Sequence, residues 1–288
     1  MLYYFQFKYN IVKIKLLSHS KKVFLILYRI NQYSSLLDNN HKSEIFQNIK
    51  DKIIDLDEFV FLTGAGISQE SGIPTFRGPE GLWRKYDPMI LASISGFNKN
   101  PKLVWEFYKY RQELICNCTP NHGHRAIAEF QKIKNSSVLT QNIDGLHEKA
   151  GTKNIVELHG NILRMQCTEC EFQETIEQKI DQPLPPVCKL CKNILRPSVI
   201  LFGEPLNPDR WTEAERLSSD CDVMFIVGTS LNVGPVNQLP LYAKRNGAIL
   251  IEVNPEPTAV FNEIMDYSIK GSATEILPQL LQLQKNKY

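Results

Sequence analysis

The sequence predicts an α/β fold in which a parallel sheet is covered by helices and interrupted by a smaller inserted module. Short apolar runs alternate with amphipathic stretches along the chain, which is the pattern of strands buried on both faces and of the helices that cover them. Two pairs of cysteines interrupt this alternation and mark the insert. With 288 residues and 43% apolar side chains, the chain is long enough to bury a substantial core.

The expected strands are the runs FVFL, SVLT, VMFIV and AILIEV, at residues 59–62, 137–140, 223–227 and 248–253. The expected helices lie at about residues 43–55, 101–115, 122–134, 208–219 and 274–285. Pro101 and Pro208 are suited to a first helical turn, and Thr274 followed by Glu275 has a cap-like arrangement. This alternation predicts a Rossmann-like domain over residues 43–288, with a helical insert at about 75–115.

Four of the seven cysteines form the segments CTEC and CKLC, with seventeen residues between the pairs. They are Cys167, Cys170, Cys188 and Cys191. Zinc ribbons have this ligand spacing, and four thiolates complete a tetrahedral shell with no open position, so the metal is structural. The intervening TIEQKIDQPLPPV is polar and proline-rich, hence a poor core without a metal. We therefore expect a zinc-ribbon module at about 163–197, with two coincidental or redox-active pairs as the alternative.

The charge is nearly balanced, at +2 overall, and gives no bulk electrostatic reason to expect binding to nucleic acid. Residues 1–42 form a basic extension, since the first 37 residues contain six Lys or Arg and no acid. Its longest apolar run, VFLILY, is far below the roughly 20 residues of a membrane span, so we expect no membrane insertion. The extension is read as a disordered or helical segment in a cytoplasmic protein, or alternatively as a mitochondrial presequence.

Polar stretches follow the predicted strands, where open α/β sheets bind their ligands. The first is LTGAGISQESGIPTFRG at residues 62–78. Its Gly64 and Gly66 would let the backbone approach a phosphate, although a plain glycine turn explains them equally well. Gln69 stands where GxGxxG would place its third glycine. The segment is therefore not a standard dinucleotide-binding turn.

The other polar stretches are TQNIDGLH, ELHG and GTSLNVGP, at residues 140–147, 157–160 and 228–235. Gln141, Asn142 and Asp144 supply amide and carboxylate groups that suit sugar hydroxyls or a carboxamide, or that serve as turn formers and helix caps. His159 stands at a strand end beside Gly160 and is a candidate general base, although an isolated histidine is more often structural.

Together these segments resemble the sirtuin family of NAD-dependent protein deacylases. The resemblance rests on GAGISQESGIPTFRG, TQNIDGLHEKAG, the LHG with His159, the two CxxC pairs, RPSVILFGE and GTSLNVGP, and it covers about residues 45–285. It implies that NAD binds across the Rossmann-like domain, with the segment from Gln69 to Arg77 covering the reacting ribose. The implied cofactor-binding residues are Gly64, Ala65, Gly66, Ile67, Ser68, Phe76, Arg77, Trp83, Gln141, Asn142, Ile143, Asp144, Gly228, Thr229, Ser230, Asn254 and Ala273.

The resemblance also implies acyl transfer rather than hydride transfer. The acyl-lysine oxygen would attack C1′ of the nicotinamide ribose, and His159 would act as general base when a ribose hydroxyl attacks the resulting imidate. Asn142 and Asp144 complete the implied catalytic group. The products would be free lysine, nicotinamide and O-acyl-ADP-ribose. VILFGE, at residues 199–204, would offer a strand edge to the substrate peptide through Val199, Phe202 and Gly203.

The predicted helix at 101–115 bears on the substrate. Its expected core stripe consists of Leu103, Phe107, Tyr110 and Leu114. Tyr108 and Arg111 are neighbours beside that stripe and suit a carboxylate, since arginine offers two parallel donors. This YxxR resembles the signature of sirtuins that remove malonyl, succinyl or glutaryl groups. The alternative is a surface arginine paired with Glu106 or Glu113.

The expected function is therefore NAD-dependent deacylation of acylated lysine side chains in proteins, with removal of succinyl, malonyl and also acetyl groups. The alternatives are a plain lysine deacetylase, a protein mono-ADP-ribosyltransferase with the same cofactor and histidine, and a non-catalytic NAD or zinc interaction module. A conventional NAD oxidoreductase is disfavoured by the missing third glycine.

Overall fold

The computed structural model describes residues 3–7, 10–14, 39–76, 81–176, 183–258 and 263–282. The chain divides into two compact units, Met1–Gln47 and Asn48–Tyr288. In the first unit, β1 (Tyr3–Phe7) and β2 (Asn10–Ile14) form an antiparallel hairpin, which differs from the helix or disorder expected for this extension. Helix α2 spans Asn39–Ile53. Among the helices described, none has the length and apolar character that crossing a membrane requires.

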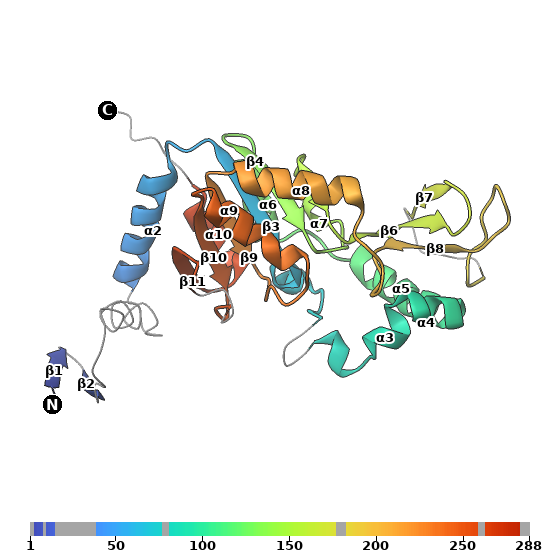
Figure 1. Cartoon of the computed structure of the whole chain (residues 1–288), viewed down its shortest axis with the longest axis horizontal. Coiled ribbons are helices and arrows are strands. Elements are labelled where there is room, and N and C mark those ends of the chain that lie inside the picture. Colours follow the sequence, from blue (N-terminus) through green and yellow to red (C-terminus); the bar gives the residue numbers. More distant parts are fainter. Residues whose placement is uncertain are drawn as a thin grey trace. The chain divides into compact units, whose positions relative to one another are not determined.

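A six-stranded parallel sheet forms the centre of the second unit (Figure 1). In spatial order its strands are β11 (Tyr267–Lys270), β10 (Ile249–Asn254), β9 (Val223–Val227), β3 (Glu58–Thr63), β4 (Asn135–Thr140) and β5 (Ile155–Glu157). The four predicted apolar runs are β3, β4, β9 and β10, so the parallel α/β class is confirmed. The short edge strand β5 is the strand expected before His159, whereas the other edge strand, β11, was not predicted.

Alternate side chains of β3 enter two different cores. Phe59 and Phe61 face Phe130 of α6 (His122–Phe130), with ring centroids 5.0 and 5.7 Å apart. Val60 and Leu62 belong to a core shared with α8 (Pro208–Asp220) and α9 (Leu239–Arg245). This two-residue alternation is what a strand covered by helices on both faces requires.

Two helix ends differ from the predictions. Helix α6 ends at Phe130, before the expected residue 134, and Gln131 donates from Nε2 to the carbonyl of Ser136 at 2.9 Å. Helix α10 (Ala273–Leu280) is capped by Ser272, whose Oγ accepts from the Glu275 amide at 3.2 Å, so Thr274 is not the cap. Most of the predicted continuation of this helix lies in 283–288, outside the described residues.

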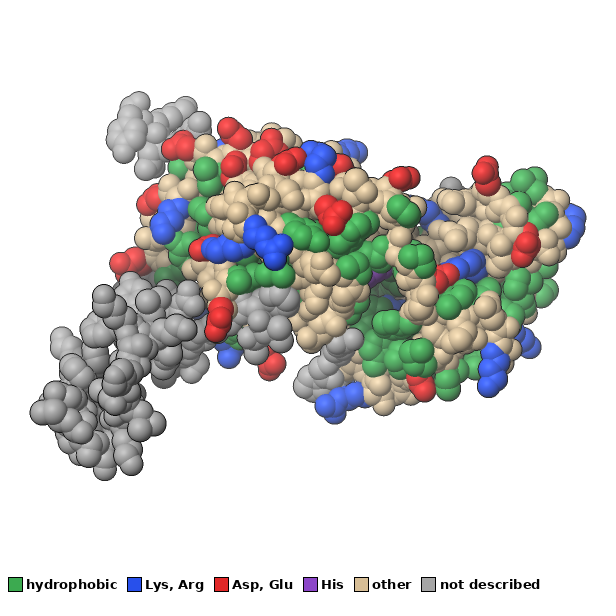
Figure 2. Space-filling view, in the orientation of Figure 1, with side chains coloured by type: hydrophobic (Ala, Val, Ile, Leu, Met, Phe, Trp, Pro, Cys, Tyr) green, Lys and Arg blue, Asp and Glu red, His purple; other side chains and the backbone are tan. Residues whose placement is uncertain are grey.

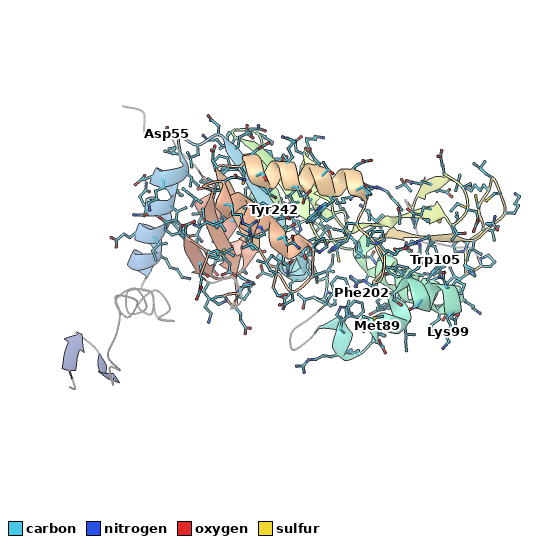
Figure 3. All side chains as sticks on the ribbon, in the orientation of Figure 1. Asp55, Met89, Lys99, Trp105, Phe202 and Tyr242 are labelled. Carbon is cyan, nitrogen blue, oxygen red and sulfur yellow. The ribbon has the colours of Figure 1, made fainter. Side chains whose placement is uncertain are left out.

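The predicted helical insert and the predicted zinc module form one packed region. The insert contains a 3₁₀ turn (Leu82–Arg84) and the helices α3 (Pro88–Leu91), α4 (Ile94–Lys99) and α5 (Pro101–Cys116). The module is a three-stranded antiparallel sheet of β7 (Gln173–Thr175), β6 (Gly160–Cys167) and β8 (Leu195–Val199). A shared core joins the two, and Trp105 of α5 donates from Nε1 to the Leu195 carbonyl at 2.7 Å (Figure 3).

The strand order places a ligand crevice at the centre of the sheet. From β3 the order continues through β4 and β5 in one direction, and from β9 through β10 and β11 in the other. In open α/β sheets, ligands bind beyond the carboxyl ends of the strands at such a reversal. The loops after β3 and β9 are therefore neighbours at the expected ligand site.

Candidate active site

A cavity of about 1210 Å³ lies at the carboxyl ends of β3, β4, β9 and β10 and extends to α5 and the segment after β8. Figure 2 shows the hollow in the molecular surface, with hydrophobic side chains along its margin. The predicted cofactor residues that line it are Gly64, Ala65, Gly66, Phe76, Trp83, Gln141, Asn142, Ile143, Gly228, Thr229, Ser230 and Asn254. The other predicted residues that line it are His159, Tyr108, Arg111, Val199, Phe202 and Gly203.

Four predicted site residues are not part of the cavity wall. Ile67 and Ser68 are buried in a 3₁₀ helix (Ala65–Ser71), and Asp144 is buried behind the wall. Ala273 is buried in the first turn of α10. The side chains of these four residues are buried, so their predicted contacts with the cofactor stay predictions. Arg77 lies outside the described residues.

The glycines of the first loop allow a close contact with another loop that the sequence did not predict. Gly66 donates to the carbonyl of Gly228 at 2.8 Å, and a Cβ on Gly66 would lie 2.7 Å from the Gly228 Cα. Gly228 itself has φ +59, in the left-handed region. Gly64 and Gly66 therefore make room for the loop after β9, and both also line the cavity, so their approach to a phosphate stays a prediction.

Side-chain amides join this pair of loops to the ends of β4 and β10. Gln141 donates from Nε2 to Thr229 Oγ1 at 2.9 Å, and Asn254 donates from Nδ2 to the Thr229 carbonyl at 3.1 Å. Hydrogen bonds thus join residues from the ends of four strands. We call the part of the cavity that is lined by the loops after β3, β4, β9 and β10 the cofactor end.

Behind the wall, a buried network orients Asn142. Asn142 donates from Nδ2 to the Gly64 carbonyl at 3.0 Å and to Ser68 Oγ at 3.2 Å. Ser68 in turn donates to Asp144 Oδ2 at 2.8 Å. Burial raises the pKa of Asp144, while hydrogen bonds from the Leu146 amide and from Ser68 oppose that shift. Hydrogen bonds through Ser68 therefore link Asp144 to Asn142 at the cavity wall.

Two buried histidines that we did not predict continue this network. His124 Nε2 lies 3.3 Å from Ser68 Oγ, and His147 of α7 (Leu146–Lys149) has its Nε2 3.0 Å from Thr63 Oγ1. The two rings are 4.9 Å apart. Burial lowers the pKa of His124 to about 4 and that of His147 well below 6.5, so both are neutral near pH 7. Burial is what keeps both histidines neutral, and no local sequence pattern indicated that they would be buried.

His159 has the geometry of a general base. Its Nδ1 lies 3.0 Å from the Gln141 carbonyl, and because a carbonyl only accepts, Nδ1 holds the proton and Nε2 keeps its lone pair. Burial lowers the pKa of His159, and this hydrogen bond partly opposes the shift. The imidazole is therefore neutral near pH 7 and can accept a proton at Nε2 in the cavity.

The buried face of α5 differs from the predicted stripe. Leu103 is 38% exposed and Tyr110 is 54% exposed, whereas Tyr108 and Arg111 are only 4% and 5% exposed. The actual buried positions are Val104, Trp105, Phe107, Tyr108, Arg111, Gln112 and Ile115. The stripe is rotated because the face with Trp105 packs against the core of the zinc module. A surface arginine, the alternative for Arg111, is thus excluded.

Arg111 lies at the other end of the cavity, which we call the acyl end, lined by Phe107, Tyr108 and Arg111 of α5. Its Nη1 is buried and has no hydrogen-bond partner among the described residues. Burial lowers the pKa of Arg111 and raises the pKa of Tyr108 to about 12. An arginine stays protonated in proteins, so the acyl end holds a buried positive charge on which the Asp144 carboxylate acts electrostatically, although no described residue hydrogen-bonds to Nη1.

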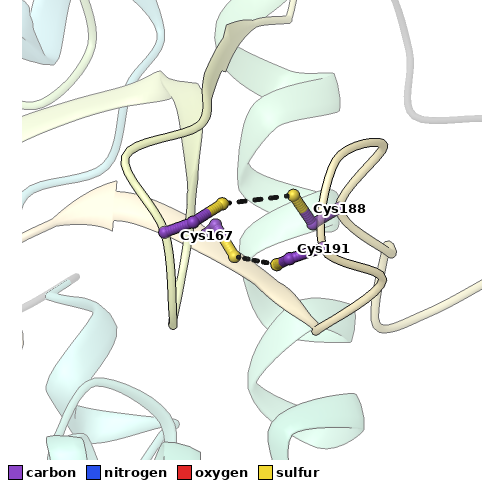
Figure 4. Close-up of side chains that lie close together, drawn as sticks. Cys167, Cys188 and Cys191 are labelled. Atoms are coloured by element: carbon purple, nitrogen blue, oxygen red, sulfur yellow. Dashed lines mark hydrogen bonds between the residues drawn. The ribbon is translucent and has the colours of Figure 1, made fainter.

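The four predicted zinc ligands lie together. All four Sγ atoms are within 4.8 Å of one another, with Cys167 and Cys191 at 3.3 Å and Cys170 and Cys188 at 3.7 Å (Figure 4). Four sulfurs at about 2.3 Å from a tetrahedral zinc would be about 3.8 Å apart. The cluster therefore fits a structural zinc ion.

Further lining residues were missed. Asn232 and Val233 lie in the predicted polar stretch after β9, and Glu256 and Thr258 follow Asn254. Asn232 and Val233 were inside the predicted stretch but were not chosen as site residues, whereas Glu256 and Thr258 would have been found by extending the prediction a few residues past Asn254. Trp211 also lines the cavity from α8, and nothing in its sequence context indicated this.

The fold and the cavity define a class of protein: an α/β enzyme with a ligand crevice at the sheet reversal, a neutral histidine base and a zinc ribbon. Known proteins resemble the chain over most of its length. The Sir2 family matches residues 64–235. NAD-dependent protein deacylase 1 of Caldanaerobacter subterraneus subsp. tengcongensis is 50% identical over 214 residues, which cover 74% of this chain and 88% of that protein. The chain belongs to the Sir2 family.

Further relatives agree. NAD-dependent protein deacylase 2 of Pyrobaculum aerophilum is 45% identical over 83% of this chain and 96% of its own. A crystal structure of a Sir2 homologue with NAD has a TM-score of 0.77 at 41% identity, covering 82% of this chain and 92% of that one. A Sir2 protein with a deacetylated p53 peptide and 3′-O-acetyl-ADP-ribose has a TM-score of 0.73 at 35% identity, covering 82% and 97%. The predicted family and fold are confirmed.

Proposed function

We propose that this enzyme removes acyl groups that end in a carboxylate, such as succinyl and malonyl, from lysine side chains of proteins, and that it removes acetyl groups as well. The chain is an NAD-dependent protein deacylase, the activity for which its relatives are named. The preference for an acyl carboxylate is our proposal, and the acyl end of the cavity supports it.

At the cofactor end, the residues present fit a dinucleotide. Glycine-rich and amide-rich loops meet at the sheet reversal, where such ligands bind. Bound NAD supplies the ADP-ribose that accepts the acyl group. Asn142 offers an oriented amide at the wall, and His159 holds its own Nδ1 proton on the Gln141 carbonyl while Nε2 accepts a proton from the attacking hydroxyl.

The observation that supports the acyl preference is the buried Nη1 of Arg111, which has no hydrogen-bond partner among the described residues. Burying a charge without a partner is unfavourable, and structures avoid it unless a ligand or ion completes the site. Tyr108 and Arg111 both line the cavity and are about one helical turn apart on α5. A guanidinium and a phenol hydroxyl together provide charged and neutral donors for one carboxylate. An acetyl group would leave these donors unused.

The test compares succinyl-lysine and acetyl-lysine versions of one peptide, with NAD, for the parent enzyme and Arg111→Met. We expect kcat/KM for the succinyl peptide to fall by about 10²-fold or more, the size of a lost buried charge pair. Acetyl turnover should stay within a few-fold. Methionine removes a buried unpaired charge, so the melting temperature should not fall.

Arg125→Met is the matched control, because Arg125 is exposed on α6. It should change neither turnover. If the succinyl and acetyl reactions of Arg111→Met decreased equally, or if succinyl turnover were unchanged, the proposed acyl preference would be wrong.

A further inference from the structure

Phe76 contacts two parts of the cavity that come from different segments of the chain. It follows the loop after β3, whose glycines line the cofactor end. Its ring also lies against Arg111 of α5, with 4.5 Å between the guanidinium carbon and the ring centroid. One side chain is therefore shared by the cofactor end and the acyl end.

The position of Phe76 is fixed by its neighbours. Trp83 donates from its backbone amide to the Phe76 carbonyl at 3.1 Å, and Leu82 donates to the Thr75 carbonyl at 3.0 Å. The Phe76 ring also packs on the Trp83 ring, with centroids 5.1 Å apart. Because backbone and ring are both held, the contact with Arg111 belongs to the built wall of the cavity.

The contact leaves the guanidinium available to a ligand. An aromatic ring attracts a cation over its face, and more strongly when the cation is withdrawn from water. Arg111 is only 5% exposed. Carboxylates instead bind in the plane of the guanidinium, along its N–H edge. Phe76 therefore stabilises the buried charge from one side, while Nη1 has no hydrogen-bond partner among the described residues.

We propose that Phe76 is a specificity-determining residue for carboxylate-ended acyl groups, because its ring holds the Arg111 guanidinium in the orientation that receives the acyl carboxylate. This inference rests on the proposed function. It also connects the two ends of the cavity, since Phe76 lies in the loop after β3 and its ring contacts Arg111. If Phe76 acted on the cofactor alone, succinyl and acetyl substrates would be affected equally.

The experiment is a double-mutant cycle read with two substrates. The ratio of kcat/KM for succinyl peptide to that for acetyl peptide is measured for the parent, Phe76→Leu, Arg111→Met and the double variant. Use of the ratio cancels any loss at the cofactor end. We expect Phe76→Leu to lower the ratio by about 10-fold, the size of a desolvated cation–π contact. In the Arg111→Met background, Phe76→Leu should leave the ratio unchanged.

Two further variants separate the aromatic face from side-chain size and from helix packing. Phe76→Tyr keeps the ring and should keep the ratio. Phe97→Leu makes the same change in a phenylalanine that lies 5.9 Å from a different arginine, Arg196, and is not part of the cavity wall. It should also leave the ratio unchanged.

The outcomes distinguish the inference from the proposed function. If Arg111→Met alone does not lower succinyl turnover, the proposed acyl preference fails. If Arg111→Met lowers it but Phe76→Leu reduces the ratio equally in both backgrounds, the acyl preference stands and the inference about Phe76 is overturned. If Phe76→Leu lowers the ratio in the parent but leaves it unchanged in the Arg111→Met background, both the proposed acyl preference and the inference about Phe76 are supported.

Discussion

The two ends of the cavity satisfy their polar groups in different ways. At the cofactor end, the amides of Gln141, Asn142 and Asn254 all have protein hydrogen-bond partners. At the acyl end, the buried Nη1 of Arg111 has no such partner among the described residues. Among the described residues, the side-chain amides of the cofactor end are therefore satisfied by the protein itself, whereas the acyl end keeps an unsatisfied buried donor, which the proposed acyl carboxylate would satisfy.

This difference corresponds to how each end is supported. The loops of the cofactor end follow strands of one parallel sheet with its own core. Helix α5 of the acyl end packs instead on the zinc module, through a shared core and the Trp105 hydrogen bond. The two ends should therefore respond to different perturbations.

The largest expected effect is from removal of the structural zinc. Binding energy at such a site is folding energy, so a chelator should unfold the module and release α5. We expect loss of deacylation with both acyl peptides, together with a calorimetric transition that splits into an early event for the module and a later one for the sheet. Added zinc should restore both signals, and Cys221→Ser, outside the cluster, should behave as the parent. A single unchanged transition after complete metal removal would contradict this account.

The next effect is from His159, which serves both ends equally. Removal of a general base typically lowers the rate by about 10²–10⁴-fold. His159→Ala should therefore lower kcat for succinyl and acetyl peptides by the same factor within this range, without a change in circular dichroism. This is the opposite of the selective loss expected for Arg111→Met. Retained turnover, or a loss confined to one acyl group, would assign the proton transfer to another residue.

A smaller effect is expected from a substitution at Gly228 that impairs only the cofactor end. Gly228 has φ +59, and a Cβ there would lie 2.5 Å from the Ile67 amide nitrogen. Gly228→Ala should therefore push the loops after β3 and β9 apart and raise the KM for NAD by about 10-fold or more, at a strain of roughly 1–3 kcal/mol.

Gly247→Ala is the matched control for this change. Gly247 also has a positive φ, +93, but nothing lies within 4 Å of its added Cβ. It should have a similar backbone strain and a normal KM for NAD. If both variants raised the KM alike, the close approach of the two loops would not explain the effect.

The sequence predicted the sheet and most of the cofactor end, because apolar runs and the polar residues directly after them are local signals. It did not predict the partner of Gly66. That partner is Gly228, and β3 and β9 are far apart in the sequence although adjacent in the sheet. The predicted buried face of α5 was also wrong, because it was chosen by apolar character, and the face that packs contains Arg111 and Gln112 while Leu103 and Tyr110 are exposed. Which face packs is decided by Leu195 and the zinc module, through contacts that helical periodicity does not contain.

The smallest effect concerns the buried histidine pair behind the cofactor end. In the folded protein burial lowers the pKa of His124 to about 4, below its ordinary value of 6.5. Between these two values the unfolded chain binds a proton that the folded chain does not. Stability is therefore fully present above pH 6.5 and falls as the pH decreases toward 4, by about 1.4 kcal/mol per pH unit for this histidine.

His147, whose pKa burial also lowers, acts in the same direction. Urea denaturation at pH 7.5 and pH 5.0 should therefore show a clear loss of unfolding free energy at the lower pH. His124→Asn should remove the share of that loss that belongs to His124, whereas His122→Gln, at an exposed position of the same helix, should not. An unchanged pH dependence in His124→Asn would mean that the pair does not stabilise the cofactor end as neutral imidazoles. Because Arg111 does not titrate in this range, its guanidinium adds nothing to the effect, and the difference in pH dependence between the parent and His124→Asn isolates the contribution of His124.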